Sequence, residues 1–445
     1  KSGFFFCFPP MTSDFDQART LFLEGIEHFE ADRLTDAERC FEASLARLPG
    51  RASTLTNLGA VRLRLGQSLA ALECLEPVVA AEPDNFEAWA HRAVALGALG
   101  RLEDALASDE RALALNADSA PVRRHRGSML QGLGRLGEAL AVFTDEVRRN
   151  PDDAEAWLHH GEALLAQDRS PEALASFDRS LALDAGQPQA WHRRGAILKY
   201  LEQPARAAEA FEQALATGGD PAINGFLLAS VSKKPAPPHP PSGYVQSLFD
   251  GYAADFERHL VEVLRYQGHT RLLQSLPGDP ARRYVSALDL GCGTGLCAPL
   301  LRPRVERLTG VDLAPSMVEK SRAGGHYDDV LLADLIEHLA TTPQRHDLLV
   351  AADVMNYVGD LEPVFRGANR VLEADGLFCF TIERAERDDG GFGLRPSLTY
   401  AHTESYLRGL ARDHGFEVLE IAEHPVREDR REPVEGLYVY MKRAT

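Results

Sequence analysis

The residues best suited to chemistry lie in the segment 287–301, which reads ALDLGCGTGLCAPLL. Its apolar beginning predicts a buried strand, and its end predicts the start of a helix. Between the two, Gly291, Gly293 and Gly295 alternate with other residues, and the next apolar run ends in Asp312. Glycines allow a backbone to approach a ligand closely, and an acid at the next strand end accepts hydrogen bonds from ribose hydroxyls. The segment therefore predicts a site for a nucleoside cofactor.

The spacing of the glycines distinguishes between two kinds of cofactor. Dinucleotide-binding folds use G-x-G-x-x-G and aim a helix N-terminus at the pyrophosphate. Here the third glycine comes one residue earlier, and Asp289 precedes the first. The resulting D-x-G-x-G-x-G resembles the first motif of class I S-adenosylmethionine methyltransferases. The resemblance implies S-adenosylmethionine (SAM) as the cofactor, with Asp289 positioning the loop or receiving the methionine amine.

The elements that must position this site follow in order through residues 244–445. Apolar runs predict seven strands, at residues 287–290, 308–311, 330–332, 347–351, 377–383, 417–421 and 437–441. Helical patterns separate the first five, which predicts a doubly wound parallel sheet with ligands at the carboxyl ends of its strands. We therefore expect a seven-stranded, Rossmann-like class I methyltransferase domain of the α/β class.

The resemblance assigns further cofactor contacts to the ends of these strands. Asp312, followed by Leu313, is expected to take both ribose hydroxyls. Asp334 is expected to approach the adenine amino group, with the Leu335 amide on the ring. At Ala352 the chain is expected to pass beneath the sulfonium.

Two more residues belong to the predicted cofactor site. The apolar residues of 244–266 have helical spacing, and the resemblance implies a helix that lies over the cofactor. Tyr252, whose tip is polar, is the cofactor contact expected from this helix. Cys292 lies inside the glycine loop, where we expect a small filler rather than a nucleophile. No metal site is expected.

Methyl transfer from a sulfonium is a direct displacement, so a base is useful only when the acceptor must lose a proton. Asp353 and Tyr357 follow the fourth predicted strand, where class I enzymes hold catalytic or substrate-gripping groups. His402, with Tyr400 beside it, is the base candidate expected over the substrate mouth. Arg395 is a candidate partner for an acceptor carboxylate or phosphate. The alternatives are a helix-capping histidine and a solvated arginine.

The first half of the chain repeats itself every 34 residues from 18 to 221. Small residues recur at one position of the repeat: Gly25, Gly59, Ala93, Gly127, Gly161 and Gly195. Large apolar residues recur at another: Phe41, Leu75, Phe143, Phe177 and Phe211. The pattern resembles six tetratricopeptide repeats (TPR), each a helix–turn–helix unit, and implies an all-α solenoid with a concave face. We expect that face to dock a protein or peptide, the alternative being a dimerisation or spacer module.

Two positions depart from the repeat. Asp109 stands where other repeats have a large apolar residue, and Arg123 where they have Trp or Leu. These positions face each other across consecutive repeats. The departure predicts an ion pair between Asp109 and Arg123 in place of an aromatic contact, or two side chains turned to solvent.

The remaining segments delimit the two halves. Residues 1–17 are expected to be a disordered or non-native tail, because KSGFFFCFPP precedes a natural start at Met11. The apolar segment 222–232 should cap the last repeat. Five prolines make residues 233–243 a stiff linker and the domain boundary. The overall expectation is α + α/β, with the methyltransferase domain at 244–445.

Composition narrows the function classes. The 445 residues carry a formal net charge of −18, which argues against a general binder of nucleic acids. No run of 18 apolar residues predicts a membrane span. The six cysteines lack C-x-x-C spacing, which is typical of reduced thiols in a cytoplasmic protein. The charge and the apolar runs together predict no nucleic-acid and no membrane partner.

Three stretches make the resemblance more specific: LFDGYAADFERHL, AADVMNYVGDLEPVF and GLRPSLTYAHTESYLRGLARDHGFEVL. Together they resemble the predicted bacterial TPR-repeat methyltransferases, whose substrates are undefined. The resemblance implies methylation of a small-molecule or carrier-bound acceptor, with the repeats docking a partner. The alternatives are methylation of a protein recruited by the repeats, and a non-catalytic TPR adaptor.

Overall fold

The computed structural model describes residues 13–232, 234–252, 258–385, 391–429 and 431–444. Most of the N-terminal segment expected to be disordered therefore lies outside the described residues. Contacts divide the chain into two compact units, residues 1–194 and 195–445. The division falls within the last repeat, so the second unit holds that repeat's second helix as well as the α/β domain.

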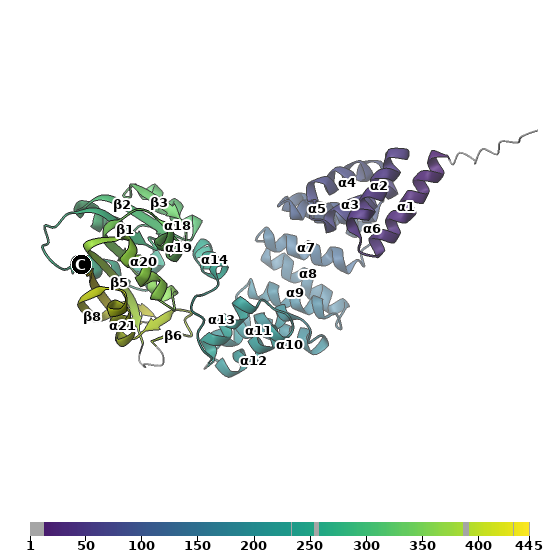
Figure 1. The fold of residues 1–445 in the computed structure, drawn as a ribbon. Helices are drawn as coiled ribbons and strands as arrows, with labels where there is room; N and C mark the ends of the chain where they lie inside the picture. The colour runs from purple at the N-terminus through teal and green to yellow at the C-terminus, as the bar shows by residue number, and fades with distance from the viewer. Residues whose placement is uncertain (1–12, 233, 253–257, 386–390, 430, 445) are drawn as a thin grey trace, which may run out of the picture. The chain divides into compact units, whose positions relative to one another are not determined.

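The described part of the first half consists of paired antiparallel helices (Figure 1). The helices are α1 (Asp14–Glu30), α2 (Leu34–Arg47), α3 (Ala52–Arg64), α4 (Ser68–Ala81), α5 (Phe86–Ala98), α6 (Leu102–Leu115), α7 (Ala120–Gly132), α8 (Leu136–Arg149), α9 (Ala154–Leu165), α10 (Ser170–Leu183), α11 (Pro188–Tyr200) and α12 (Pro204–Ala216). A thirteenth, α13 (Pro221–Val231), follows the sixth pair as the predicted capping segment.

Within a pair, the recurring small residue lies against the recurring large one. A Cβ added at Gly127 would lie 2.4 Å from the ring of Phe143, and one at Gly161 would lie 2.7 Å from the ring of Phe177. Both phenylalanines are fully buried. Glycine is thus what lets the second helix of each pair approach the first closely enough to bury its aromatic ring.

The predicted ion pair between Asp109 and Arg123 is wrong. Asp109 is buried and lies 2.8 Å from Nδ1 of His125, while Arg123 forms its ion pair with the buried Glu146. Arg123 also donates to the carbonyl of Ala117, six residues earlier. At the same register Trp157 donates its indole N–H to the carbonyl of Pro151. Arg123 therefore replaces the polar contact of the tryptophan, which turns its charge away from Asp109.

The α/β domain is built on one sheet whose main order is β3-β2-β1-β4-β5-β7-β6, with β9 on β5 and β8 on β9. The described residues form nine strands: β1 (Tyr284–Leu290), β2 (Val305–Asp312), β3 (Asp329–Leu332), β4 (His346–Ala351), β5 (Leu372–Arg384), β6 (Phe392–Leu394), β7 (Tyr400–His402), β8 (Phe416–Asp429) and β9 (Glu432–Arg443). The seven predicted strands are all present. The sequence analysis missed β6 and β7, since three residues are too few to show a period.

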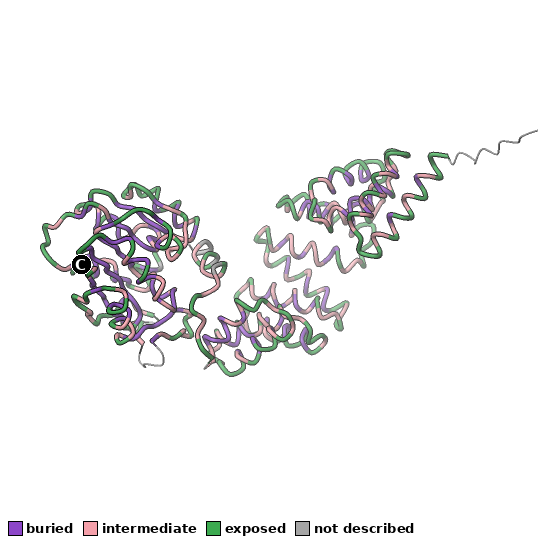
Figure 2. The backbone as a smooth tube through the Cα atoms, viewed as in Figure 1, coloured by how far each residue is buried: buried purple, intermediate pink, exposed green. Residues whose placement is uncertain are grey.

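Strands β1 to β5 pair in parallel, and β9 runs antiparallel to β5 and β8. The connecting helices are α17 (Ala298–Leu301), α18 (Pro315–Gly324), α19 (Leu335–Thr341), α20 (Glu362–Val371) and α21 (Glu404–Asp413). Most residues of β1, β2, β4 and β5 are buried, whereas most of β8 is exposed or half-buried (Figure 2). Successive side chains of β5 pack into two separate hydrophobic cores. Phe378 and Phe380 belong to one core, and Leu377 and Cys379 belong to the other. The sheet is therefore covered on both faces.

In the described residues between the repeats and β1, the helical segments are α14 (Ser242–Tyr252), a π-helical turn (His259–Val263) and α16 (Gly268–Gln274). Nowhere in the described part of the chain is a helix both long and apolar enough to span a bilayer.

We expect Gly127→Ala to lower the melting temperature of the repeat array, because the added methyl group overlaps the buried Phe143 ring. Overpacking of this kind costs about 1–3 kcal/mol. Gly137→Ala in α8 is the matched control, since a Cβ there meets nothing within 4 Å and alanine favours the helix. Thermal unfolding followed by circular dichroism measures both, and equal shifts for the two variants would contradict the packing argument.

Candidate active site

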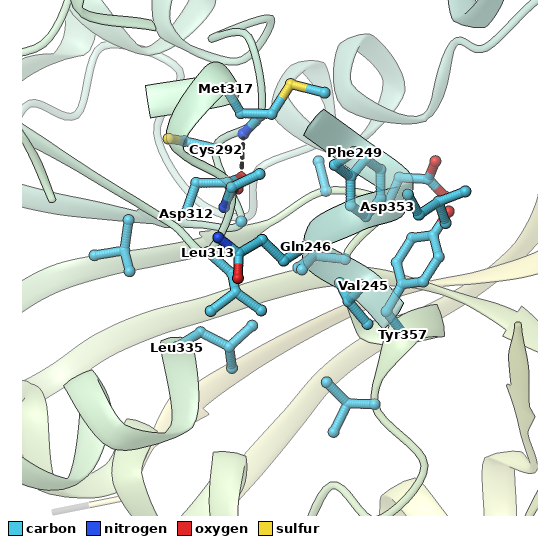
Figure 3. A pocket seen from close by; sticks show the side chains of 18 of the residues that line it. Val245, Gln246, Phe249, Cys292, Asp312, Leu313, Met317, Leu335, Asp353 and Tyr357 are labelled. Atoms are coloured by element: carbon cyan, nitrogen blue, oxygen red, sulfur yellow. Dashed lines mark hydrogen bonds between the residues drawn. The ribbon is translucent and has the colours of Figure 1, made fainter. Parts of the chain in front are cut away.

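A cavity of about 680 Å³ opens at the carboxyl ends of β1, β2, β3 and β4. Its walls come from the loops that follow these strands, from α14 and residues 239–240 just before it, from segments within residues 260–269 and 397–399, and from Arg427 of β8. Asp312, Leu313 and Leu335 lie on one side of it, and Asp353 and Tyr357 lie on the other (Figure 3). Val245, Gln246 and Phe249 of α14 lie between the two groups (Figure 3). This is the sheet edge at which α/β folds bind ligands.

The glycine loop forms the floor of the cavity. Gly291 has a φ of 64°, and a Cβ there would lie 2.3 Å from the side chain of Val354. The amide of Gly293 donates to Oδ2 of Asp312 at 2.8 Å. Gly295 has a φ of 98° and lies against Ser321 and Tyr327 rather than lining the cavity. Only residues without a Cβ allow this path at Gly291 and Gly295.

Asp312, at the end of β2, ties the loop to the start of the next helix. Its Oδ1 accepts from the amide of Ala314 at 2.9 Å, while Oδ2 holds Gly293. Each carboxylate oxygen has a second lone pair, so the side chain can also accept from a ligand hydroxyl. Asp312 lines the cavity, as the cofactor role predicted for it requires.

Asp334 caps α19 at the end of β3. Its Oδ1 accepts from the amides of Ile336 and Glu337 at 2.8 and 3.0 Å, and it lines the cavity together with Leu335. The cavity wall here also includes Ala314, Met317 and Ile336, an apolar slot beside two acids. Such a slot suits a flat base next to a ribose.

The remaining residues predicted to contact the cofactor differ in whether they line the cavity. Cys292 and Ala352 line the cavity. The thiol of Cys292 is buried and lies 3.7 Å from the Ser321 hydroxyl, which fits a small filler. The side chain of Tyr252 lies outside the described residues.

Asp289 does not line the cavity. Its buried carboxylate accepts from the hydroxyl of Tyr327 at 2.7 Å. Burial raises the pKa of Asp289 to about 7, a rise that the Tyr327 hydrogen bond opposes and the nearby Asp312 reinforces. Of the two roles predicted for it, the structure supports positioning of the loop, because Tyr327 also packs against Gly295.

Asp353 and Tyr357 line the other side of the cavity. Asp353 has a φ of 59°, unusual for a residue with a side chain, and its amide donates to the Thr381 hydroxyl at 2.9 Å. Burial raises the pKa of Asp353 to about 6, although Arg427 lowers it. The ring of Tyr357 packs edge-on against Phe249 of α14 at 5.2 Å.

A charged network behind Asp353 was missed by the sequence analysis. Arg427 of β8 lines the cavity, donates to Oδ1 of Asp353 at 2.9 Å and also pairs with Glu383. Glu383, at the end of β5, is paired in turn with Arg395 at 3.0 Å. These residues lie far apart in sequence and follow no motif, so only pairing of β8 and β5 with β9 brings them together. Arg395 is thus committed to Glu383, contrary to the acceptor role considered for it.

The expected positions of His402 and Tyr400 are wrong. Neither lines the cavity, and both are fully buried in β7. Nε2 of His402 donates to the carbonyl of Gly359 at 2.9 Å, and burial lowers its pKa to about 4. The hydroxyl of Tyr400 donates to the carbonyl of Pro237 at 2.8 Å. The hydrogen bonds of β7 to β5 and β6 place these side chains in the core rather than over the opening.

Comparison with known proteins agrees with this geometry. Residues 288–380 match the family described as a methyltransferase domain. Residues 56–120, 126–188 and 188–216 match tetratricopeptide repeat families. The chain therefore joins tetratricopeptide repeats to a methyltransferase domain.

Two curated relatives align with part of the chain. A malonyl-[acyl-carrier protein] O-methyltransferase of Hamiltonella defensa is 34% identical over 35% of this chain and 55% of its own length. The enzyme of the same name from Geobacter sulfurreducens is 33% identical over 38% of this chain and 60% of its own length. The chain thus spans little more than half of these relatives. Among solved structures, a tetratricopeptide repeat protein from Parabacteroides merdae is 18% identical, covers 47% of this chain and 82% of its own, and has a TM-score of 0.41.

We expect Asp289→Asn to stabilise the protein increasingly as the pH rises from 5 towards 7, with no further gain between 7 and 8. The folded pKa of Asp289 is about 7 against its usual 3.8, so the unaltered protein loses stability between these two pH values, where only the unfolded state is ionised. The neutral amide removes that penalty.

Asp328→Asn should instead lower stability by the same amount across this range. The amide of Leu308 and the guanidinium of Arg302 lower the pKa of Asp328, so the charged form stabilises the fold, and the group is ionised in both the folded and the unfolded state over this range. Melting temperatures of both variants and the unaltered protein across this pH range test the pair. A pH-independent difference for Asp289→Asn would contradict the assignment.

Proposed function

We propose that this chain is a SAM-dependent methyltransferase acting on a hydroxyl group of a small or carrier-bound acceptor. The observation that carries the proposal is the single cavity in which the glycine loop, two strand-end acids and Asp353 meet. SAM supplies a methyl group on a sulfonium, and transfer leaves S-adenosylhomocysteine as a neutral thioether.

The adenosine end of the cavity suits this cofactor. Gly291 clears the floor, Asp312 presents carboxylate oxygens to a ribose, and Asp334 with Leu335 borders an apolar slot. The described lining residues carry four acids, Asp312, Asp334, Glu337 and Asp353. This excess of negative charge favours a cationic ligand such as a sulfonium.

The opposite end favours an uncharged acceptor. Among the described lining residues the one arginine or lysine is Arg427, which already faces Asp353 and Glu383. An acceptor carboxylate would bring a further negative charge beside Asp353 without a new cation to match it. A hydroxyl carries no such penalty. In this respect the site differs from what the names of the two relatives suggest.

Asp353 is the residue suited to remove the hydroxyl proton. Its pKa of about 6 leaves it ionised at neutral pH yet basic enough to share a proton during the reaction. The proton passes from the acceptor hydroxyl to the Asp353 carboxylate while the hydroxyl oxygen takes the methyl group. Arg427 orients that carboxylate, and α14 excludes water through Val245, Leu248 and Phe249.

The repeats are proposed to dock the protein that carries or delivers the acceptor. Support comes from the repeat array itself, since stacked helix pairs of this kind present an extended surface. A protein substrate recruited by the repeats is the second candidate. The enclosing residues of α14 favour the smaller acceptor. We also propose a cytoplasmic location with no nucleic-acid or membrane partner, in keeping with the acidic composition.

Calorimetric titration of SAM is the first test. We expect the unaltered protein to bind and Asp312→Ala to bind at least tenfold more weakly, because the change removes the ribose acceptor and frees Gly293. Asp347→Ala is the matched control. Asp347 also accepts from two backbone amides, of Val285 and Ser286 at 2.8 Å, but does not line the cavity. Absence of binding to the folded, unaltered protein would reject the proposed function.

Asp353→Asn tests the acceptor chemistry once a labelled-methyl screen has yielded an acceptor. We expect kcat to fall by about 10²–10⁴-fold, the usual contribution of a general base. In the unaltered enzyme kcat/KM should fall as the pH drops through about 6, where Asp353 takes up a proton. Undiminished transfer by the variant, or a carboxylate as the favoured acceptor, would contradict the hydroxyl assignment.

A further inference from the structure

Tyr400 and His402 do not reach the cavity, but they contact a segment that does. Residues 237–240, here called the strap, precede α14. His239 and Pro240 of the strap line the cavity, while the carbonyls of Pro237 and Pro238 accept hydrogen bonds. All of these residues lie within the compact unit 195–445.

Tyr400 holds the strap directly. Its hydroxyl donates to the carbonyl of Pro237 at 2.8 Å from a ring that is fully buried. Proline has no amide hydrogen to offer a neighbouring strand, so a stretch rich in proline is held in place mainly through its carbonyls. Among the described residues, the carbonyls of Pro237 and Pro238 accept three hydrogen bonds, of which this is one.

The other two come from the loop after Tyr357. The amides of Gly359 and Asp360 donate to the carbonyl of Pro238 at 3.0 and 2.9 Å. His402 fixes that loop from behind, since its Nε2 donates to the carbonyl of Gly359. A Cβ on Gly359 would lie 2.6 Å from the Tyr400 ring and 2.8 Å from the Pro238 carbonyl. Glycine there is therefore what lets strap, loop and tyrosine meet.

The residues on either side of the strap contact the last two helices before it, α12 and α13. Phe226 of α13 is buried and packs against the rings of Tyr244 and Tyr400, at 5.4 and 6.4 Å. Lys234 pairs with Glu212 of α12 at 2.9 Å. The strap is therefore held through its own carbonyls and also through its flanking residues, Lys234 before it and Tyr244 after it.

We propose that Tyr400 and His402 are positioning residues that hold the strap as a wall of the acceptor compartment. The strap joins the loop two residues beyond Tyr357 and leads into α14, whose Phe249 packs on Tyr357. His239 and Pro240 therefore border the acceptor end and limit the size of what enters it. That the strap limits the size of the acceptor rests on the proposed function, whereas the positioning of the strap by Tyr400 and His402 does not.

Hydrogen exchange on the full-length protein tests the hold directly, with Tyr400→Phe as the variant. Loss of one buried hydrogen bond should raise the exchange rate of the Gly359 and Asp360 amides about fivefold, since a net hydrogen bond contributes about 1 kcal/mol. The same variant should weaken binding of S-adenosylhomocysteine several-fold, because α14 follows the strap.

Tyr440→Phe is the matched control. Tyr440 is equally buried and donates to a backbone carbonyl, that of Leu272 at 3.2 Å, but does not contact the strap. It should leave exchange at Gly359 and Asp360 unchanged. His402→Gln retains a hydrogen-bond donor near the Nε2 position and should preserve the protection of the Gly359 and Asp360 amides from exchange. His402→Ala should not preserve it.

Unchanged exchange of the Gly359 and Asp360 amides in Tyr400→Phe, or an equal rise in Tyr440→Phe, would overturn the positioning role. The binding arm distinguishes the two proposals. If the unaltered protein fails to bind S-adenosylhomocysteine while the exchange result holds, the proposed function fails and the positioning role stands.

Discussion

The contact on which the site depends is the pair of hydrogen bonds from the amides of Gly293 and Ala314 to Asp312. One carboxylate joins the glycine loop after β1 to the turn after β2. The loop can follow its path because Gly291 leaves room for Val354. Asp289 and Tyr327 brace the loop from the opposite side. The floor of the cavity is therefore set before any ligand arrives, which reduces the ordering that binding must impose.

A second constraint is electrostatic. Asp353, Glu383, Arg427 and Arg395 form a chain of alternating charges at the end of β4 and β5. Two guanidinium groups match two carboxylates, so the buried cluster is balanced. Burying a charge without a partner costs several kcal/mol, and balance is what makes this cluster tolerable. It also leaves Asp353, at the proposed acceptor end, as a carboxylate that is held in place yet not neutralised by a surplus of cations.

The third constraint is the continuity between the repeats and the α/β domain. α13, the strap and α14 form one path that ends at the wall of the cavity, and β7 holds its middle through Tyr400 and His402. Tyr400 and His402, whose residue types suggested acid–base chemistry, are thereby explained as residues that hold the strap and its neighbouring loop in place. A neutral, fully buried histidine that donates to a backbone carbonyl stabilises a loop, and the loop in turn bonds to the strap.

The sequence by itself determined the repeat array, seven strands and the cofactor end of the site. It did so because these features depend on short-range patterns: a 34-residue period, alternation of apolar runs, and glycines followed by strand-end acids. Within the repeats, Arg123 shows what such patterns cannot predict. Its ion-pair partner is Glu146 on another helix, whereas the repeat pattern predicted Asp109. Only the tertiary structure decided the acceptor end. Arg427 reaches Asp353 through the pairing of β8 with β9 and of β9 with β5. His402 is buried because β7, in which it lies, pairs with β5 and β6. Contacts between residues so distant in sequence are set by how the whole sheet packs, and no local pattern records them.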